Sequence, residues 1–455
     1  MSQQLAAPMP VDDQAPGPAG VPLLGNTLQF GRDAFSFLRE CAARYGDVVN
    51  FTVLGRQFYQ LNHPAHIEHV LIHNQKNYQK GSFLTAQFDD FIGEGLLLSD
   101  GALWRQQRQL VQPAFHPTRI ARFADTMTAF TTRLLDTWQG DVPQDLQPQM
   151  SQLTLEIVAH ALFDVDIRED ERAITEAVNV VLAHLMRRTS SPLTPPMWVP
   201  TPSNRRYRRA LDTLDGILTE LIVERRTAGA AGDDVISMLL RAEADSGTPK
   251  TDEQLKDELL TLLFAGHETT AVALTFAVHS IATHPEVTAK FEAELDTVLG
   301  GRTPTFADVC SLTYTENIVK EALRLYPPVF GIIREAIEPD EIGGYRIPAG
   351  AVVAMNQLVV HRDPRYFESP DEFDPDRWTE AFAARLPRFA YFPFGGGPRK
   401  CIGERFAMLE AVLVLATMYQ RFRFDLISER DLNLKPSITT RPKSPIVVVP
   451  RRRSA

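Results

Sequence analysis

A glycine-rich turn that carries one cysteine, followed directly by a long apolar segment, most constrains what this chain can fold into. The turn reads FGGGPRKCIG over residues 394–403, and the pattern after it predicts a helix from Glu404 to about Arg421. A thiolate at Cys401 would face free backbone N–H groups and the positive end of the helix dipole, which suits an anionic sulfur bound to a metal. The glycines let the backbone pass close to a large flat group. The turn therefore predicts a metal-bound thiolate.

Two ordinary alternatives exist for these residues. A lone cysteine before a helix is often a small buried hydrophobe, and a glycine run is often only a turn. Here the pattern Phe-x-x-Gly-x-Arg-x-Cys-x-Gly resembles the heme-ligand loop of the cytochrome P-450 superfamily. The resemblance implies that Cys401 is the axial ligand of the iron of heme b (iron protoporphyrin IX). It also places Phe394, Gly395 and Gly403 against the cofactor.

Length and composition narrow the class of protein. The 455 residues contain no Gly/Ser linker, charge block or internal repeat, so we expect one large domain over residues 21–455 after a disordered leader, 1–20. A net charge of −10 argues against a nucleic-acid partner. Three cysteines without CxxC spacing form neither a disulfide framework nor a zinc site. The N-terminus has no apolar signal or anchor segment. The chain therefore resembles the soluble bacterial type of the superfamily, and we expect a cytoplasmic monomer.

The hydrophobic periodicity predicts a fold that is mainly α with a minor β portion. Helices are expected over residues 35–45, 64–72 and much of the 200 residues after Leu103, with a hairpin over 47–61 and short strands again over 335–355 and 446–450. Residues 79–100 form an apolar stretch without a clean period, which is unusual unless it covers something. This arrangement is similar to the cytochrome P-450 fold, and the resemblance spans residues 21–451.

Glu321 and Arg324 form a Glu-x-x-Arg pair on one face of an expected helix. Alone, such a pair is more often a solvent-exposed ion pair. Its order in the chain, before FDPDRW at residues 373–378 and before the cysteine turn, resembles the family pattern. The resemblance implies a buried structural network of Glu321, Arg324 and Arg377.

The segment AGHETT, residues 265–270, lies inside an apolar helix expected from about Thr251 to Thr283, where Thr251 and Gln254 form a capping box. An Ala-Gly pair in mid-helix permits either close approach of a flat ligand or a local kink. The segment resembles the oxygen-binding helix of the family. That resemblance implies that Ala265 contacts the heme and that Thr269 and Glu268 deliver protons. His267 is interpreted as an ordinary helix-face residue, not an iron ligand.

The remaining candidates bind the cofactor or line the substrate pocket. Trp104 and Arg108, four residues apart on a helix, could simply stack on each other. The resemblance instead makes this pair, together with Arg334 and Arg399, ligands of the heme propionates. It also places a set of side chains in the substrate pocket, although core packing is nearly as good an explanation for each. The set is Leu97, Phe88, Phe264, Val329, Phe330, Ile332 and Ile438.

The resemblance implies a heme-thiolate monooxygenase that inserts one oxygen atom of O2 into a C–H bond of a lipophilic substrate. A fatty acid, a terpenoid or a carotenoid is expected. Electrons would come from a separate ferredoxin with its reductase or from a flavodoxin. One alternative is a hydroperoxide-dependent peroxygenase or isomerase on the same fold, against which the Glu268–Thr269 pair counts. The other is a heme sensor or carrier without turnover.

Overall fold

The computed structural model describes residues 14–81, 85, 91–163, 170–190, 195–230, 232–246 and 251–453. The chain divides into two compact units. Unit 1 comprises Met1–Gly81, Gly331–Pro370 and Leu386–Lys400, and unit 2 comprises Ser82–Phe330, Asp371–Arg385 and Cys401–Ala455. Both units are therefore built from segments far apart in the sequence. The prediction of a single large domain over residues 21–455 stays a prediction.

Unit 1 is built on a five-stranded sheet with the order β1-β2-β8-β5-β3. Its β2–β8 pairing is parallel and the other pairings are antiparallel. The predicted hairpin is confirmed, and its turn has positive φ at both Leu54 (53°) and Gly55 (74°), the conformation of tight hairpin turns. The elements are α1 (Thr27–Arg32), α2 (Ala34–Tyr45), β1 (Val48–Val53), β2 (Arg56–Leu61), α3 (Pro64–Glu68), η1 (His69–His73), η2 (Gln75–Asn77), β3 (Tyr78–Gln79), β5 (Ile332–Ala336), β6 (Asp340–Ile342), β7 (Tyr345–Ile347), β8 (Val352–Met355), α15 (Gln357–Val360) and η7 (Gly397–Arg399).

The described end of the expected leader differs from the prediction. Residues 1–13 lie outside the described residues. Ala15 is only 6% exposed and belongs to the core of unit 1, and the backbone N–H of Asn50 in β1 donates to the Pro16 carbonyl at 2.9 Å. A Cβ on Gly17 would lie 1.7 Å from the Asn50 carbonyl oxygen. Glycine at position 17 is thus what allows this segment to lie against β1, and the ordered chain begins earlier than its Pro/Gly/Ala composition indicates.

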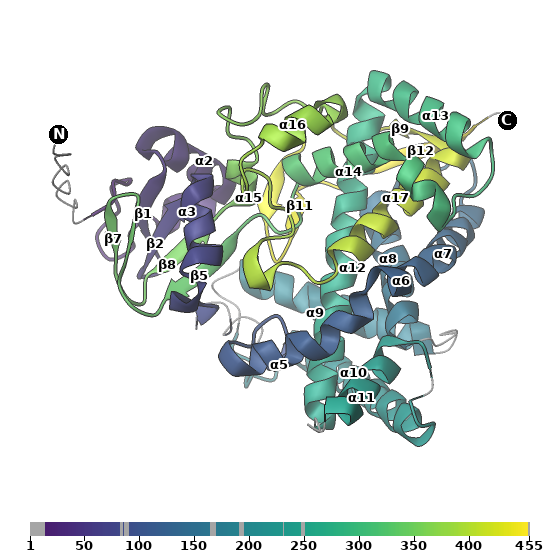
Figure 1. Cartoon of the computed structure of the whole chain (residues 1–455), viewed down its shortest axis with the longest axis horizontal. Helices are drawn as coiled ribbons and strands as arrows, with labels where there is room; N and C mark the ends of the chain where they lie inside the picture. Colours follow the sequence, from purple (N-terminus) through teal and green to yellow (C-terminus); the bar gives the residue numbers. More distant parts are fainter. Residues whose placement is uncertain are drawn as a thin grey trace, which may run out of the picture. The chain divides into compact units, whose positions relative to one another are not determined.

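Unit 2 is mainly helical, and the long helix α12 (Asp252–Thr283) runs through it (Figure 1). The Thr251–Gln254 capping box is confirmed at its start. Helices α8, α10, α13, α14 and α17 all contact α12. It is the one described helix that is long and apolar enough to cross a membrane, but 67% of its apolar window is buried inside the protein, as in a core helix.

The other elements of unit 2 are shorter. Its small sheet has the order β4-β12-β9, and a separate hairpin pairs β10 with β11. The elements are α5 (Gly101–Val111), η3 (Gln112–Phe115), α6 (Pro117–Ile120), η4 (Ala121–Phe123), α7 (Ala124–Thr137), β4 (Gln144–Asp145), α8 (Leu146–Phe163), α9 (Asp170–Ser190), α10 (Pro202–Thr227), α11 (Val235–Ser246), α13 (Pro285–Leu299), η5 (Phe306–Ser311), α14 (Thr313–Leu325), η6 (Pro375–Arg377), α16 (Glu380–Arg385), α17 (Glu404–Arg421), β9 (Phe422–Leu426), β10 (Leu434–Pro436), β11 (Thr440–Pro442) and β12 (Val447–Arg452).

Candidate functional site

Cys401 is exposed and lies three residues before α17, whose residues from Leu409 to Tyr419 are buried. The predicted helix start at Glu404 is confirmed. The helix dipole favours a thiolate at this position. Cys41 shows the opposite environment, because burial raises the pKa of its thiol to about 12 and keeps it neutral. Cys401 is thus exposed at a position that favours the thiolate, which is the form of cysteine that binds metals.

Helix α5 brings Trp104 and Arg108 to the same unit as Cys401. Trp104 packs partly buried against the unit's hydrophobic core, and Arg108 is half-buried. Burial lowers the pKa of Arg108, and the negative charge of Cys401 opposes this change. A half-buried guanidinium within electrostatic reach of the thiolate is suited to bind an anionic group.

The middle of α12 presents a short open strip within an otherwise buried stretch. Between Glu258 and Ile281 only Phe264, Ala265, Gly266 and Thr269 are more than marginally exposed, and Ala265 is the most open of them. The Thr269 hydroxyl donates to the Ala265 carbonyl at 2.7 Å, so it is satisfied within the helix and not turned outward. The strip is mostly apolar, which suits contact with an apolar group.

The reason for the mid-helix glycine differs from the expected one. A Cβ on Gly266 would come within 2.8 Å of Cγ2 of Val158 on α8. The glycine therefore allows α8 and α12 to pack closely, whereas the sequence analysis ascribed it to the approach of a ligand or to a kink. The neighbouring His267 is buried, its Nε2 lies 2.7 Å from the Ser151 hydroxyl, and burial lowers its pKa to about 3. Its Nδ1 is buried and has no hydrogen-bond partner among the described residues, so only one ring nitrogen of this helix-face histidine is satisfied.

Glu268 is 2% exposed and has an uneven set of partners. Its Oε1 accepts hydrogen bonds from Thr439 Oγ1 (2.9 Å), Arg441 Nε (3.1 Å) and Arg441 Nη2 (2.5 Å). Its Oε2 is buried and has no hydrogen-bond partner among the described residues. Burial raises the pKa of Glu268, and the charge of Arg441 opposes the rise. One carboxylate oxygen is therefore held, and the other is available.

The predicted Glu321 network is present within unit 2. Arg324 donates to both oxygens of Glu321 at 2.9 and 2.8 Å, and Arg377 donates to Oε1 at 2.9 Å. Glu321 and Arg324 are both 0% exposed. The indole N–H of Trp378 (2.9 Å) and the backbone N–H of Asp374 (3.0 Å) also donate to Glu321. The sequence analysis named Trp378 as part of the FDPDRW motif but did not include it in the network.

The apolar stretch before α5 is held by two adjacent carboxylates of α12, which we call the acidic clasp (Asp257 and Glu258). Asp257 accepts from the Glu94 backbone N–H at 3.0 Å and Glu258 from the Leu96 backbone N–H at 3.1 Å. A Cβ on Gly93 would lie 2.2 Å from the Asp257 carboxylate, so this approach requires glycine. The clasp fixes the backbone directly before Leu97.

The proposed pocket residues of unit 2 have mixed surroundings. Leu97 is 41% exposed and Val329 39% exposed, whereas Phe264 and Ile438 pack partly buried against the core. Phe264 also contacts Phe91 edge to face, with ring centroids 4.1 Å apart. Phe330 is half-buried, and Phe88 lies outside the described residues. The apolar side chains of these residues suit a hydrophobic ligand.

Unit 1 contains the remaining candidates. Arg334 on β5 is 7% exposed and donates to the Ile333 carbonyl at 2.8 Å, and Arg399 in η7 is half-buried. Gly395 has φ of 71°, and a Cβ there would lie 3.1 Å from Ile332 Cδ1. Ile332 packs against the core of unit 1, and the neighbouring Phe394 is half-buried. These positions stay predictions for cofactor and substrate contacts.

Three polar side chains near these residues were missed by sequence reasoning. They are Arg441, the partner of Glu268, Glu258 of the clasp, and Glu410 on α17. Glu410 is 0% exposed, and burial raises its pKa well above the usual range although the Thr270 hydroxyl opposes the rise. A charged residue within an apolar helical run was the available signal for Glu258 and Glu410. Arg441 carried no such signal.

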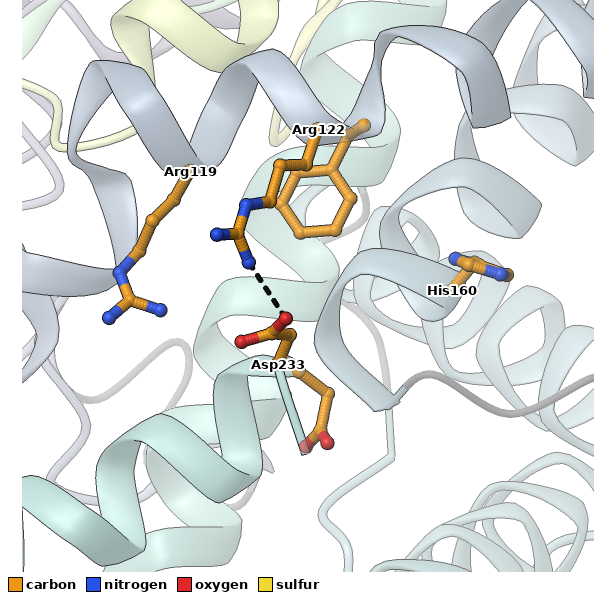
Figure 2. A pocket seen from close by; sticks show the side chains of 6 residues that line it. Arg119, Arg122, His160 and Asp233 are labelled. Carbon is orange, nitrogen blue, oxygen red and sulfur yellow. Dashed lines mark hydrogen bonds and ion pairs between the residues drawn. The ribbon is translucent and has the colours of Figure 1, made fainter. Parts of the chain in front are cut away.

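A small cavity of about 70 Å³ lies elsewhere in unit 2, between η4, α8 and the start of α11 (Figure 2). Its lining includes Arg119, His160 and the ion pair of Arg122 with Asp233 at 2.7 Å. None of the site residues predicted from the sequence lines it. This cavity is too small for a large lipophilic molecule and is not the candidate active site.

The donor set of unit 2 fits the heme that the sequence resemblance implies. The cysteine supplies a soft anionic ligand, the α12 strip supplies a mostly apolar surface, and Arg108 supplies a cation for a carboxylate. Among the described residues, no group of three or more His, Cys, Asp or Glu side chains forms an alternative metal site. The chemistry of these residues therefore agrees with a heme-thiolate centre.

Comparisons with known proteins agree with this assignment. The family model described as Cytochrome P450 matches residues 15–449. Cyclooctatin synthase of Streptomyces melanosporofaciens is 38% identical over 96% of this chain and 95% of its own length. Pentalenene oxygenase of Streptomyces avermitilis is 33% identical over 92% of both chains. The crystal structure of the cytochrome P450DA heme domain superposes with a TM-score of 0.88 at 28% identity, covering 98% of this chain and 99% of that one.

Proposed function

Because the chain belongs to the cytochrome P450 family and its relatives include a monooxygenase and an oxygenase, we propose that it hydroxylates a terpenoid. The observation that carries the proposal is its similarity, over more than nine-tenths of both chains, to cyclooctatin synthase and pentalenene oxygenase. Of the three lipophilic classes expected from the sequence, this favours terpenoids over fatty acids and carotenoids. The apolar surroundings of Phe264, Phe91 and Ile438 support a hydrocarbon-like ligand.

In this proposal, Cys401 would supply the thiolate ligand of heme b, and Trp104, Arg108, Arg334 and Arg399 would bind its propionates. Ala265, Phe394, Gly395 and Gly403 would contact the cofactor. When bound, the heme supplies the activation of O2 and the transfer of one oxygen atom into a C–H bond. The protein binds and orients the substrate and excludes water from it.

The protein also moves protons in this proposal. Oε2 of Glu268 is the buried oxygen left without a partner among the described residues, so it is the oxygen that can bind a proton and release it toward Thr269. The Thr269 hydroxyl, now donating to the Ala265 carbonyl, would rotate to pass that proton on. Electrons come from a ferredoxin with its reductase or from a flavodoxin. The exposed cations Lys400 and Arg405 suit an acidic protein partner. The protein acts as a cytoplasmic monomer.

The proposal is tested by titrating the purified ferric holoprotein with pentalenene and cyclooctat-9-en-7-ol while following the Soret absorbance. Palmitate and β-carotene serve as the comparison ligands. We expect a low-spin to high-spin shift with pentalenene or cyclooctat-9-en-7-ol and with neither comparison ligand. A shift with palmitate or β-carotene alone would replace the terpenoid assignment by that class.

A second assay separates the monooxygenase from the alternatives. Product formation is measured with a ferredoxin, its reductase and NADPH, and separately with hydrogen peroxide alone. We expect product that depends on reductant and O2. Product with peroxide alone would favour the peroxygenase, and no product in either assay would favour a sensor or carrier.

A further inference from the structure

The C-terminal hairpin formed by β10 and β11 is attached to two other segments of unit 2. Its strands pair antiparallel, with Leu434 opposite Pro442 and Pro436 opposite Thr440. Thr440 is 0% exposed, and its backbone N–H and its hydroxyl donate to the carbonyls of Pro328 (2.8 Å) and Pro327 (2.6 Å). The hairpin is thus fixed to the chain directly before Val329.

The same hairpin holds Glu268 of α12. Thr439 and Arg441 flank Thr440, and together they give three hydrogen bonds to the single oxygen Oε1. The Glu268 side chain is 3% exposed and that of Arg441 is 23% exposed. The carboxylate therefore lies inside the protein, and the cation that compensates it reaches toward water. Because Oε2 has no partner among the described residues, the hydrogen bonds that orient this carboxylate come from the hairpin.

Ile438 connects this polar arrangement to the apolar side chains. It lies at the hairpin tip, one residue before Thr439, and packs against the same hydrophobic core as Phe264. A ligand that displaces the backbone at Ile438 also moves Thr439, the next residue. Since Thr439 bonds Glu268 directly, contact at the tip and orientation of the carboxylate are mechanically linked.

We propose that Arg441 and Thr439 are positioning residues that hold the Glu268 carboxylate in one orientation, and that substrate seated against Ile438 is coupled to this orientation through the hairpin. The proposal rests on the proposed function. Substrate binding and the Arg441–Glu268 contact must then affect each other by the same factor, because binding couplings are reciprocal. Arg441 does not take part in the reaction itself. Its role is to fix the orientation of Oε2 of Glu268.

Four variants test the coupling in the heme-loaded, full-length protein. Arg441→Met removes the cation and keeps the apolar stem, and Arg441→Lys keeps the charge with a different donor geometry. Glu268→Gln removes the acceptor charge, and the double variant Arg441→Met/Glu268→Gln completes a cycle. Arg451→Met is the matched control, since Arg451 lies on β12 and pairs with Asp425 at 2.8 Å, away from Glu268.

The first measurement is the Kd of pentalenene and of cyclooctat-9-en-7-ol from the Soret shift of the ferric protein. We expect Arg441→Met and Glu268→Gln each to change Kd by about fivefold or more, and the double variant to add little. Arg441→Lys should recover part of the change, and Arg451→Met should bind like the unaltered protein. Independent, additive effects or unchanged Kd values would overturn the coupling.

The second measurement does not depend on a ligand. Hydrogen–deuterium exchange of residues 434–442 reports directly whether Glu268 holds the hairpin. We expect Glu268→Gln and Arg441→Met to speed exchange there several-fold relative to Arg451→Met. If neither terpenoid shifts the Soret band of the unaltered protein, the proposed function has failed. The positioning role then stands or falls on the exchange result, and unchanged exchange overturns it.

Discussion

Two buried glutamates of unit 2 solve the same electrostatic problem in different ways. Glu321 receives five hydrogen bonds spread over both oxygens, from Arg324, Arg377, Trp378 and the Asp374 backbone. Glu268 receives three, all on Oε1, and its Oε2 is left without a partner among the described residues. When both oxygens of a carboxylate are hydrogen-bonded, it cannot change partners without breaking several hydrogen bonds. A half-satisfied one can change partners or protonation without unfolding its surroundings.

The strongest way to break this comparison is Glu321→Gln. The substitution leaves Arg324, which is 0% exposed, without a full counter-charge, and losing one partner of a buried ion pair costs about 3–5 kcal/mol. We expect most of the folded, heme-binding protein to be lost, as measured by heme incorporation and by urea unfolding followed by circular dichroism. A decrease of less than about 1 kcal/mol in the unfolding free energy would contradict a stabilising role of this network.

The same substitution at the other site sharpens the comparison. Glu268→Gln removes a proton donor and acceptor but leaves an oxygen for Thr439 and Arg441 to bond. We expect product formation to fall by about 100-fold while the unfolding free energy changes by about 1 kcal/mol or less. The measurement is reductant-driven turnover beside urea unfolding of the same sample. Loss of stability equal to that of Glu321→Gln would mean that the two sites do not differ.

His267, the neighbour of Glu268, gives a pH-dependent test. Its pKa is lowered from 6.5 to about 3 by burial, so the folded state keeps it neutral where the unfolded state binds a proton. The stability it contributes is complete above pH 6.5 and is lost as the pH falls toward 3. Between pH 7 and 5, we expect the unaltered protein to lose about 2 kcal/mol more than His267→Asn. Parallel stability curves from urea unfolding at each pH would refute this.

Glu410 extends the comparison to a carboxyl group with even fewer partners. Burial raises its pKa well above 4.5, so the folded state retains a proton that the unfolded state releases. Stability therefore falls as the pH rises from 4.5 toward the folded pKa. Between pH 4.5 and 5.5, we expect the unfolding free energy of the unaltered protein to fall by about 1 kcal/mol more than that of Glu410→Gln. A constant difference in unfolding free energy across that range would show that Glu410 ionises normally.

The smallest effect is expected at the surface, where Lys290 and Asp376 form an ion pair at 2.6 Å. Both side chains are more than half exposed, so water and salt screen their attraction. We expect Lys290→Ala to leave the Tm within experimental error, although Asp376 adjoins Arg377 of the buried network. A measurable decrease in Tm would show that the buried network includes this surface ion pair.

Motifs in the sequence predicted the elements that carry the candidate site. The starts of α12 and α17 follow from a capping box and from the end of a glycine turn, both local patterns. Arg441 could not be predicted as the partner of Glu268, because the two lie far apart in the chain and an arginine near a strand is usually exposed. The packing reason for Gly266 is likewise a contact with α8 that no local pattern encodes.

The acidic clasp has a consequence for how this protein can change. Asp257 and Glu258 hold the segment before α5 by its backbone N–H groups at Glu94 and Leu96. The side chains of Phe91, Ile92, Leu96 and Leu98 anchor it in the core, whereas Leu97 is 41% exposed and its side chain takes part in neither anchor. Substitutions at the exposed Leu97 leave the path of the segment intact. Evolution or directed mutagenesis can thus vary the side chain at position 97 freely, while the frame that presents it is inherited unchanged.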